Sequence, residues 1–247
     1  MVWLSKLFKN DAPVASLSWL QTDMHSHLIP GIDDGSPDVE ASVSLIKGFV
    51  ALGYKKIITT PHILWEMYPN TPQIIQKGLA DVKAALAVEN IQMEISAAAE
   101  YFIDEHFVQA LQQKEPLLTL KDNMVLVEIS TITAPFDFKE VLFEMQMQNY
   151  QPVIAHPERY IYLKNNKSIF EDLKDAGCLL QLNLFSLIGH YGISVQELAE
   201  YLIKKDYYDF VGTDLHHAKH LPLLEKAASS PLLSRLKDSG SIKNSLL

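Results

Sequence analysis

The feature that most constrains the fold is a regular alternation of short apolar, β-rich runs with longer helix-like stretches. The β-rich runs are residues 22–28, 56–60, 91–97, 124–129, 152–155, 179–183 and 209–212. Strands that alternate with helices predict an α/β fold with a mainly parallel sheet. Seven such units in 247 residues favour a closed or nearly closed barrel, with a doubly wound open sheet as the alternative. The sequence has neither a dinucleotide glycine fingerprint nor a P-loop, which weakens the open, nucleotide-binding alternative.

Local signals predict where several helices begin and end. We expect helix starts at Ser36, which precedes a proline, and at capping boxes that open with Asp137, Ser168 and Ser194. Glycines at positions 53 and 177 are expected to end two helices just before the next strand.

Composition excludes several classes of protein. Hydrophobic residues make up 48% of the chain, which is enough for a large core. Thirty acidic against 21 basic residues give a net charge of −9, which disfavours a nucleic-acid partner. The single cysteine, Cys178, excludes an internal disulfide framework and predicts a cytoplasmic location. No apolar run reaches the roughly 20 residues that span a bilayer.

The first 20 residues differ from the rest and are predicted to form an N-terminal extension, while residues 21–247 are predicted to form a single domain. The extension begins with apolar residues and two lysines, Lys6 and Lys9. This pattern favours a short helix packed on the body of the protein, with peripheral contact to a membrane surface as the alternative.

The carboxyl ends of six of the seven predicted strands carry histidine or carboxylate side chains. These side chains belong to His25, His27, His62, Glu100, Glu128, His156, Asp214 and His216. His25 and His27 are two residues apart on one strand and therefore share a face. In a barrel all these ends meet at one mouth, where active sites form. Bound cations would offset the cost of burying so many polar groups together.

The ligand chemistry narrows the choice of metal and reaction. Imidazole and carboxylate ligands without cysteine suit Mn²⁺, Fe²⁺ or Zn²⁺. Eight ligands exceed the needs of one ion, so we expect two or three ions and a bridging carboxylate. Such clusters catalyse displacement at phosphorus. Arg159 follows His156 by three residues and is predicted to grip a phosphate with its planar guanidinium, a surface salt bridge being the alternative.

Together these motifs resemble the PHP (polymerase and histidinol phosphatase) superfamily. Residues 25–35 (HSHLIPGIDDG) and 156–160 (HPERY) are similar to the CpsB/CapC branch, the manganese-dependent protein-tyrosine phosphatases of bacterial capsule and exopolysaccharide synthesis. The resemblance covers residues 23–220. It implies a distorted (β/α)₇ TIM-like barrel with three metal positions.

By motif match, the resemblance also implies which residues hold each metal. The first would be held by His25, His27, Glu100 and Asp214, and Glu100 would bridge to a second held by Glu128 and His156. The third would be held by His62, His216 and Asp34, with the adjacent Asp33 as an alternative to Asp34.

The resemblance further implies direct attack of a metal-bound hydroxide on phosphotyrosine in a protein, with Arg159 on the phosphate. His216 and His220 are the candidates for a general acid. A second arginine of some relatives is absent, and Lys219 or His220 is the candidate substitute. The implied partner is a bacterial tyrosine kinase with a tyrosine-rich tail.

Other functions are compatible with the same residues. A small-molecule phosphatase of the histidinol-phosphate type or a metal-dependent phosphodiesterase would use the same cluster, because metal ligands do not report the leaving group. A catalytically silent binding protein is a further alternative. A cysteine-dependent phosphatase is excluded, since Leu184 stands where an arginine should follow Cys178.

Overall fold

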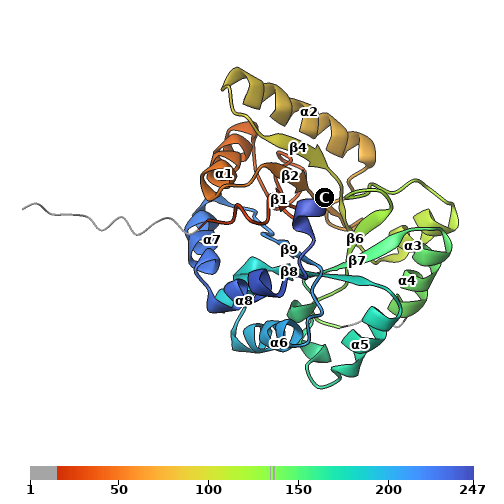
Figure 1. The fold of residues 1–247 in the computed structure, drawn as a ribbon. Coiled ribbons are helices and arrows are strands. Elements are labelled where there is room, and N and C mark those ends of the chain that lie inside the picture. Colours follow the sequence, from red (N-terminus) through yellow and green to blue (C-terminus); the bar gives the residue numbers. More distant parts are fainter. Residues whose placement is uncertain (1–15, 134, 136) are drawn as a thin grey trace, which may run out of the picture.

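A computed structural model describes residues 16–133, 135 and 137–247 of the chain. Its strands form two sheets in which every pairing is parallel. The three-stranded sheet has the order β1 (Thr22–Asp23), β2 (Lys56–Thr59), β4 (Glu94–Ala97). The six-stranded sheet has the order β3 (His62–Ile63), β5 (Glu100–Phe102), β6 (Met124–Glu128), β7 (Gln151–Ala155), β8 (Leu179–Asn183), β9 (Phe210–Gly212). The predicted α/β fold with a parallel sheet is confirmed, and the sheet curves into a half-barrel (Figure 1).

Helices cover the outside of the sheets, as Figure 1 shows. The α-helices are α1 (Val39–Leu52), α2 (Pro72–Val88), α3 (Glu105–Gln112), α4 (Phe138–Met147), α5 (Ser168–Asp175), α6 (Ile193–Lys204), α7 (Leu221–Ala228) and α8 (Pro231–Ser239). Short 3₁₀ helices are η1 (Pro157–Arg159), η2 (Ile161–Leu163), η3 (Leu184–Ile188), η4 (Ala218–His220) and η5 (Asn244–Leu246). None of the helices in the described part of the chain is long and apolar enough to cross a membrane.

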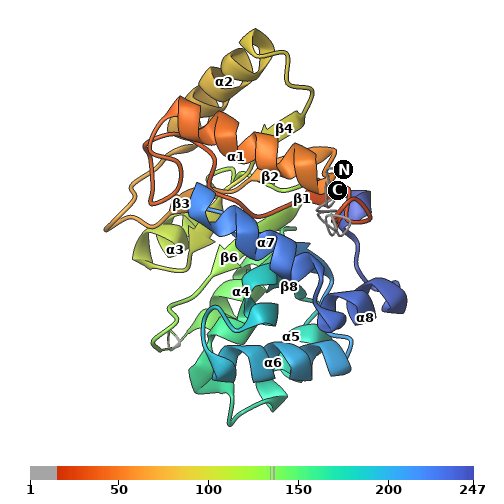
Figure 2. The same cartoon turned by 90° about the vertical axis from the view of Figure 1, so that its left-hand side faces the viewer.

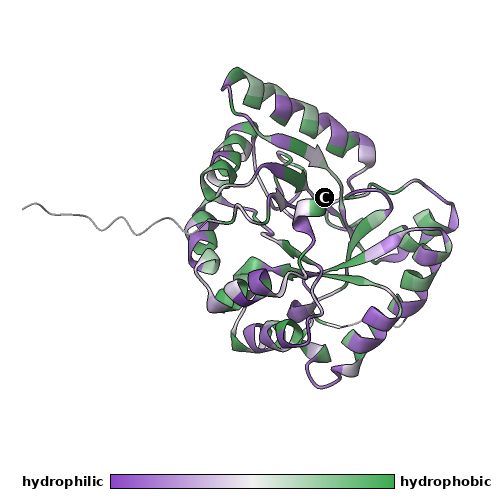
Figure 3. Ribbon diagram, in the orientation of Figure 1, coloured by the Kyte–Doolittle hydropathy of each residue, from purple (hydrophilic) through white to green (hydrophobic). Residues whose placement is uncertain are grey.

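Buried hydrophobic side chains pack on both faces of the strands. One cluster lies between strands and helices and includes Phe49 of α1 and Val127 of β6. A second, smaller cluster collects side chains from the opposite strand faces, among them Met24, Ile58, Leu126, Val153 and Phe210. The helices are hydrophobic on one side and hydrophilic on the other, which is the pattern of helices packed on a sheet (Figure 3).

Hydrogen bonds connect the two sheets at both of their meeting points. Backbone bonds from Ala98 N to the Thr59 carbonyl (2.9 Å) and from Glu100 N to the Pro61 carbonyl (3.1 Å) continue the pairing of β2 with β4 into the pairing of β3 with β5. The segments after β1 and β9 meet through an isolated parallel bridge between Ser26 and Leu215. The carboxyl ends of strands that are distant in sequence therefore lie side by side.

Some predicted helix boundaries are wrong. The N-cap of α1 is Asp38, whose side chain accepts from Ala41 N, whereas Ser36 is buried and its backbone N–H donates to the His27 carbonyl (3.1 Å). Ser168 and Ser194 lie inside the first turns of α5 and α6 instead of capping them. The Ser168 hydroxyl bonds to Asn166, and that of Ser194 accepts from Lys164.

Other boundary predictions hold. Asp137 is the N-cap residue of α4, although its side chain makes no capping bond. Gly53 and Gly177 adopt left-handed φ values of 91° and 80° at helix ends. The helix predicted for residues 1–20 lies outside the described residues up to position 15, and positions 18–20 form a turn.

Candidate metal centre

The segment after β1 places two histidines beside two carboxylates, one on β5 and one just after β9. His25 and His27 are fully buried, and their Nε2 atoms lie 3.4 Å apart. His25 Nε2 lies 3.1 Å from Glu100 Oε2 and 3.4 Å from Asp214 Oδ1. His27 Nε2 lies 3.5 and 3.4 Å from the same two oxygens. Four donor atoms thus face one point, which is what a single cation needs.

Glu100, on β5, contacts a second group of ligand residues, His156, Glu128 and His62. Its Oε1 lies 3.0 Å from His156 Nε2, which in turn lies 3.6 Å from Glu128 Oε2. His62 Nδ1 lies 3.2 Å from Glu100 Oε2 and 3.5 Å from Glu128 Oε1. The two oxygens of Glu100 therefore serve different imidazoles, which is the geometry of a bridging carboxylate.

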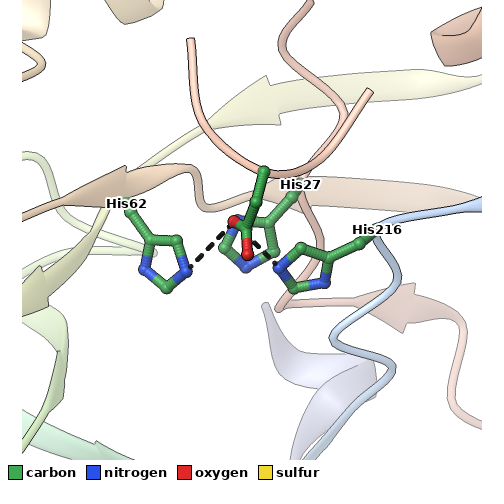
Figure 4. Close-up of side chains that lie close together, drawn as sticks. His27, His62 and His216 are labelled. Atoms are coloured by element: carbon green, nitrogen blue, oxygen red, sulfur yellow. Dashed lines mark ion pairs between the residues drawn. The ribbon is translucent and has the colours of Figure 1, made fainter. Parts of the chain in front are cut away.

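A third group forms around Asp34 at the surface of the cluster. Asp34 Oδ1 lies 3.6 Å from His62 Nε2 and 3.5 Å from His216 Nε2. The rings of His27 and His216 stack at 3.8 Å, and Figure 4 shows the three imidazoles around one carboxylate. This arrangement gathers a third set of donors at the opening of the site.

Asp33 has a different role from its neighbour. Its Oδ2 accepts from His27 Nδ1 (2.8 Å) and from His62 N (3.1 Å), and its Oδ1 accepts from Gly35 N. A Cβ atom at Gly35 would lie only 2.3 Å from the His27 carbonyl oxygen, so this turn requires glycine. Asp33 thus orients His27, while Asp34 faces the other imidazoles.

All nine predicted ligand residues are brought together in four overlapping groups, in each of which the donor atoms lie within 4.8 Å of one another. The groups are His25–His27–Glu100, His25–His156–Asp214, His62–Glu100–Glu128 and His27–Asp34–His62–His216. Within the described part of the chain, buried Glu100 Oε2 and His62 Nδ1 make no hydrogen bond, so both atoms can coordinate an ion. The residues fit a cluster of divalent cations.

The pKa values of the buried groups reflect this crowding. Burial, with the nearby charge of Arg159, lowers the pKa of His156 to about 4, so its imidazole is neutral and can act as a ligand. Burial raises the pKa of Glu128, and the charge of Glu100 raises it further. Although burial opposes it, His25 and His62 hold the pKa of Glu100 well below its usual range. Adjacent carboxylates in one buried site favour a bound cation.

Two amide side chains that the sequence analysis missed hold the ligands in place. Gln181 Oε1 accepts from His25 Nδ1 (2.9 Å) and from His156 N (3.3 Å). Asn183 Nδ2 donates to Asp214 Oδ2 (2.7 Å). Both residues lie on β8, which corresponds to the one of the seven predicted strands that carries no predicted ligand. Their i, i+2 spacing on an apolar strand was the available signal, since it places both amides on one face. Such contacts fix a ligand's tautomer and orientation.

Arg159 lies on η1, directly after His156. Its Nη1 lies 3.1 Å from Asp214 Oδ2, and its guanidinium lies 4.6 Å from the centre of the Tyr191 ring. The carboxylate is buried, so this is not a surface salt bridge. Because Arg159 remains 26% exposed, it can contact a ligand in the mouth.

The mouth is a cavity of about 930 Å³ that the cluster and Arg159 line together. This volume falls within the usual range for ligand sites. Tyr68, Phe102, Tyr191 and Lys219 line its sides. His220 also lines the mouth, but it packs against His190 and Phe185 and belongs to none of the four donor groups.

Comparison with known proteins identifies similar chains. The family model for capsular polysaccharide synthesis, CpsB/CapC, matches residues 21–237. The chain is 29% identical over 198 residues to the tyrosine-protein phosphatase YwqE of Bacillus subtilis, covering 80% of this chain and 78% of YwqE. It is 28% identical over 206 residues to the tyrosine-protein phosphatase CpsB of Streptococcus pneumoniae, covering 81% of this chain and 84% of CpsB.

Solved structures give a parallel result. A chain from the crystal structures of YwqE and CpsB, described as unique metal-dependent tyrosine phosphatases, matches with a TM-score of 0.79 and 27% identity, covering 90% of this chain and 89% of that one. A histidinol phosphate phosphatase from Lactococcus lactis matches with a TM-score of 0.57 and 15% identity, covering 89% of this chain and 94% of that one. The second match shows a shared fold alone.

Proposed function

Because the chain belongs to the CpsB/CapC family of capsular polysaccharide synthesis, we propose that it is a metal-dependent tyrosine-protein phosphatase that acts in capsular or exopolysaccharide synthesis. The observation that carries this proposal is the sharing of Glu100 between two sets of donor atoms in a mouth that Arg159 also lines. The similar proteins YwqE and CpsB are both named tyrosine-protein phosphatases.

We assign three cation positions. His25, His27, Glu100 and Asp214 would hold the first, and Glu100, Glu128 and His156 the second. Asp34, His62 and His216 would hold the third. The donor separations of 3.0–3.6 Å within these sets support the assignment. Mn²⁺ is the proposed metal, with Fe²⁺ or Zn²⁺ as alternatives, because imidazole and carboxylate donors suit all three.

When bound, the cations supply Lewis acidity that activates water and offsets negative charge at phosphorus. The protein's own groups do the rest. Arg159, whose Nη1 also pairs with Asp214, would bind phosphate oxygens through its planar guanidinium. The departing phenol has a pKa near 10 and leaves more readily than an alkyl alcohol. Of the two candidates for returning a proton to it, His216 has its Nε2 in the third donor set and its Nδ1 on the Asp214 carbonyl, so His220 is the remaining candidate, with Lys219 as the candidate for a second contact to the phosphate.

We further propose that residues 21–247 form one domain in which the two sheets close into a distorted (β/α)₇ barrel. The bridge between Ser26 and Leu215 and the bond from Asp214 N to the His25 carbonyl (2.7 Å) support closure between the ends of β1 and β9. The proposed substrate is the tyrosine-rich tail of a cytoplasmic kinase domain, reached from the cytoplasm. A barrel mouth is open enough to admit an extended phosphopeptide.

The test compares three phosphate esters with Mn²⁺ present: a phosphotyrosyl peptide, a phosphoseryl peptide and histidinol phosphate. Preferential phosphate release from phosphotyrosine, lost on chelation and restored by Mn²⁺, is the expected result. Preference for histidinol phosphate would replace the proposal with a small-molecule phosphatase on the same cluster. Release from none of the three, with metal bound, would leave the phosphodiesterase and the silent binding protein.

A further inference from the structure

A groove beside the mouth has a lining that the phosphatase chemistry does not use. We propose that this groove, centred on Trp65 and α3, binds a segment of the substrate chain next to the phosphotyrosine, and that it prefers a segment with a lysine or arginine beside an apolar residue. The inference rests on the proposed phosphatase function and extends it to substrate sequence.

The groove consists of two adjoining cavities of about 330 and 430 Å³, and Trp65 lines both of them. The Trp65 indole is 46% exposed and stacks on the His106 ring of α3 at 3.9 Å. Its backbone N–H donates to Asp104 Oδ2 (3.1 Å), and Asp104 also caps α3. Figure 2 shows α3 next to the end of β3, from which Trp65 follows. A half-exposed tryptophan held from two sides is a typical anchor for a bound chain.

The strands that build the metal centre also build this groove. His62 and Glu100 face the metal cluster, whereas the next residues, Ile63 and Tyr101, line the smaller cavity of the groove. This follows from the alternation of side chains along a strand. The larger cavity shares Leu64, Glu66 and Phe102 with the mouth. A peptide with its phosphotyrosine in the mouth therefore has a continuous path to Trp65.

The charges along the groove indicate what kind of segment it takes. Four carboxylates line it, those of Glu66, Asp104, Glu105 and Glu115, and its lining among the described residues includes no lysine or arginine. Within the described residues, Glu105 and Glu115 take part in no ion pair. Unpaired carboxylates beside an exposed indole favour a cationic side chain, which gains from both charge and the ring face.

The mouth itself differs in charge from the groove. Arg159 and Lys219 line the mouth together with the carboxylates of the metal cluster, and neither of these two cationic side chains lines the groove. An acidic side chain on the substrate would meet the groove carboxylates unfavourably. The structure thus favours a substrate with basic residues on the side of the phosphotyrosine that reaches Trp65.

The experiment uses phosphotyrosyl peptides with a neutral sequence, in which one position at a time carries lysine or glutamate on either side of the phosphotyrosine. We expect kcat/KM to favour lysine over glutamate by about fivefold at positions on one side only, and the difference to shrink as salt screens the charges. Trp65→Ala should lower kcat/KM for the preferred peptide about tenfold, chiefly through KM. The double variant Glu105→Gln/Glu115→Gln should reduce the lysine preference, since only Glu66 and Asp104 then remain as carboxylates of the groove.

Matched variants and a small substrate separate this inference from the proposed function. Phe143→Ala removes another exposed aromatic side chain, on α4, and Asp81→Asn/Glu225→Gln removes two exposed carboxylates elsewhere. Neither control should change peptide selectivity. Turnover of 4-nitrophenyl phosphate, which is too small to reach Trp65, should be unchanged in all these variants.

Three outcomes would overturn the inference: equal kcat/KM for lysine and glutamate peptides at every position, Trp65→Ala with wild-type peptide kinetics, or a dimer that Trp65→Ala dissociates without affecting peptides. The last would assign the groove to a second copy of the chain. If no ester is hydrolysed, the Kd of fluorescently labelled lysine and glutamate peptides still tests the groove, because that measurement needs no turnover.

Discussion

The hydrogen bonds of the buried Glu158 carboxylate predict how much stability the protein loses when this side chain is removed. Glu158 lies between His156 and Arg159 and is fully buried. Its Oε1 accepts from Asn183 N (2.9 Å) and from Ser186 Oγ (2.7 Å), and its Oε2 accepts from Tyr208 OH (2.9 Å). Glu158 therefore ties η1, which carries Arg159, to β8 and η3.

Replacing Glu158 with alanine leaves these three donors without an acceptor. Each unsatisfied buried group costs about 1–3 kcal/mol. Because burial raises the pKa of Glu158, the native carboxylate already carries a desolvation cost, and the total should lie near the low end of the sum, at about 3 kcal/mol. For a chain of this size that corresponds to a fall in Tm of about 6–12 °C.

Glu158→Gln is the matched control. The amide oxygen can accept from Asn183 N and Ser186 Oγ, and the amide nitrogen can donate to Tyr208 OH once that hydroxyl turns. We expect this variant to lose less than about 1 kcal/mol. Since Arg159 is the next residue, Glu158→Ala should also lower kcat/KM for 4-nitrophenyl phosphate more than Glu158→Gln does.

The assay is equilibrium urea unfolding with Mn²⁺ present, combined with phosphate release on the same samples. The reasoning fails if Glu158→Gln loses as much stability as Glu158→Ala, because then the charge and not the hydrogen bonds would matter. It also fails if Glu158→Ala loses less than about 1 kcal/mol. Tyr208→Phe, which removes one donor, should itself cost about 1 kcal/mol.

Four further predictions concern the metal centre and the phosphate contact. His156→Ala should abolish phosphate release and reduce bound metal measured by atomic emission while leaving the circular dichroism spectrum unchanged; full activity would refute the assignment of His156 as a ligand. Arg159→Lys should raise KM more than it lowers kcat, because lysine lacks the planar fork; unchanged kinetics with a lower Tm would instead assign Arg159 a structural role. Gln181→Leu, which removes the acceptor of His25 Nδ1, should weaken Mn²⁺ binding by about 10–100-fold in a titration followed by activity, and unaltered affinity would show that Gln181 does not orient the ligand. Chelation should stop turnover and lower Tm, since Glu100, Glu128 and Asp214 would then share a buried site without cations; a Tm that chelation leaves unchanged would contradict this account.

The strands and the ligands could be predicted from the sequence because both depend on the residue types within short segments. A run such as residues 124–129 is apolar and ends in Glu128, and the strand found there, Met124–Glu128, agrees within one residue. The residue types alone did not separate Asp33 from Asp34, since the two are chemically identical neighbours; the resemblance implied Asp34, with Asp33 as the alternative, and Asp34 is the one that lies with His62 and His216. Their difference arises from the turn at Gly35, which directs one carboxylate toward His27 and the other toward His216.

Features that depend on contacts between distant segments could not be predicted from the sequence. The helix starts at Ser168 and Ser194 were mispredicted because a Ser-x-x-Glu pattern also occurs one or two residues inside a helix, where other partners take the hydroxyl. The stack of Trp65 on His106 joins residues from different units of the fold. No local pattern marks such a pair, and only the parallel pairing of β3 with β5 brings the two together.

The backbone at two ligand positions explains how separate strands direct their side chains to one cluster. His156 and Asp214 follow the ends of β7 and β9, and both adopt left-handed conformations, with φ values of 32° and 52°. Non-glycine residues occupy this region at a cost of about 1–3 kcal/mol unless their surroundings hold them there. Here Gln181 Oε1 accepts from His156 N, and the His25 carbonyl accepts from Asp214 N. His156 is therefore held by a bond to Gln181, and Asp214 by a bond to His25, whose ring Gln181 orients. The hydrogen bonds that position His25 thus also stabilise the left-handed backbone of the two ligands that follow β7 and β9.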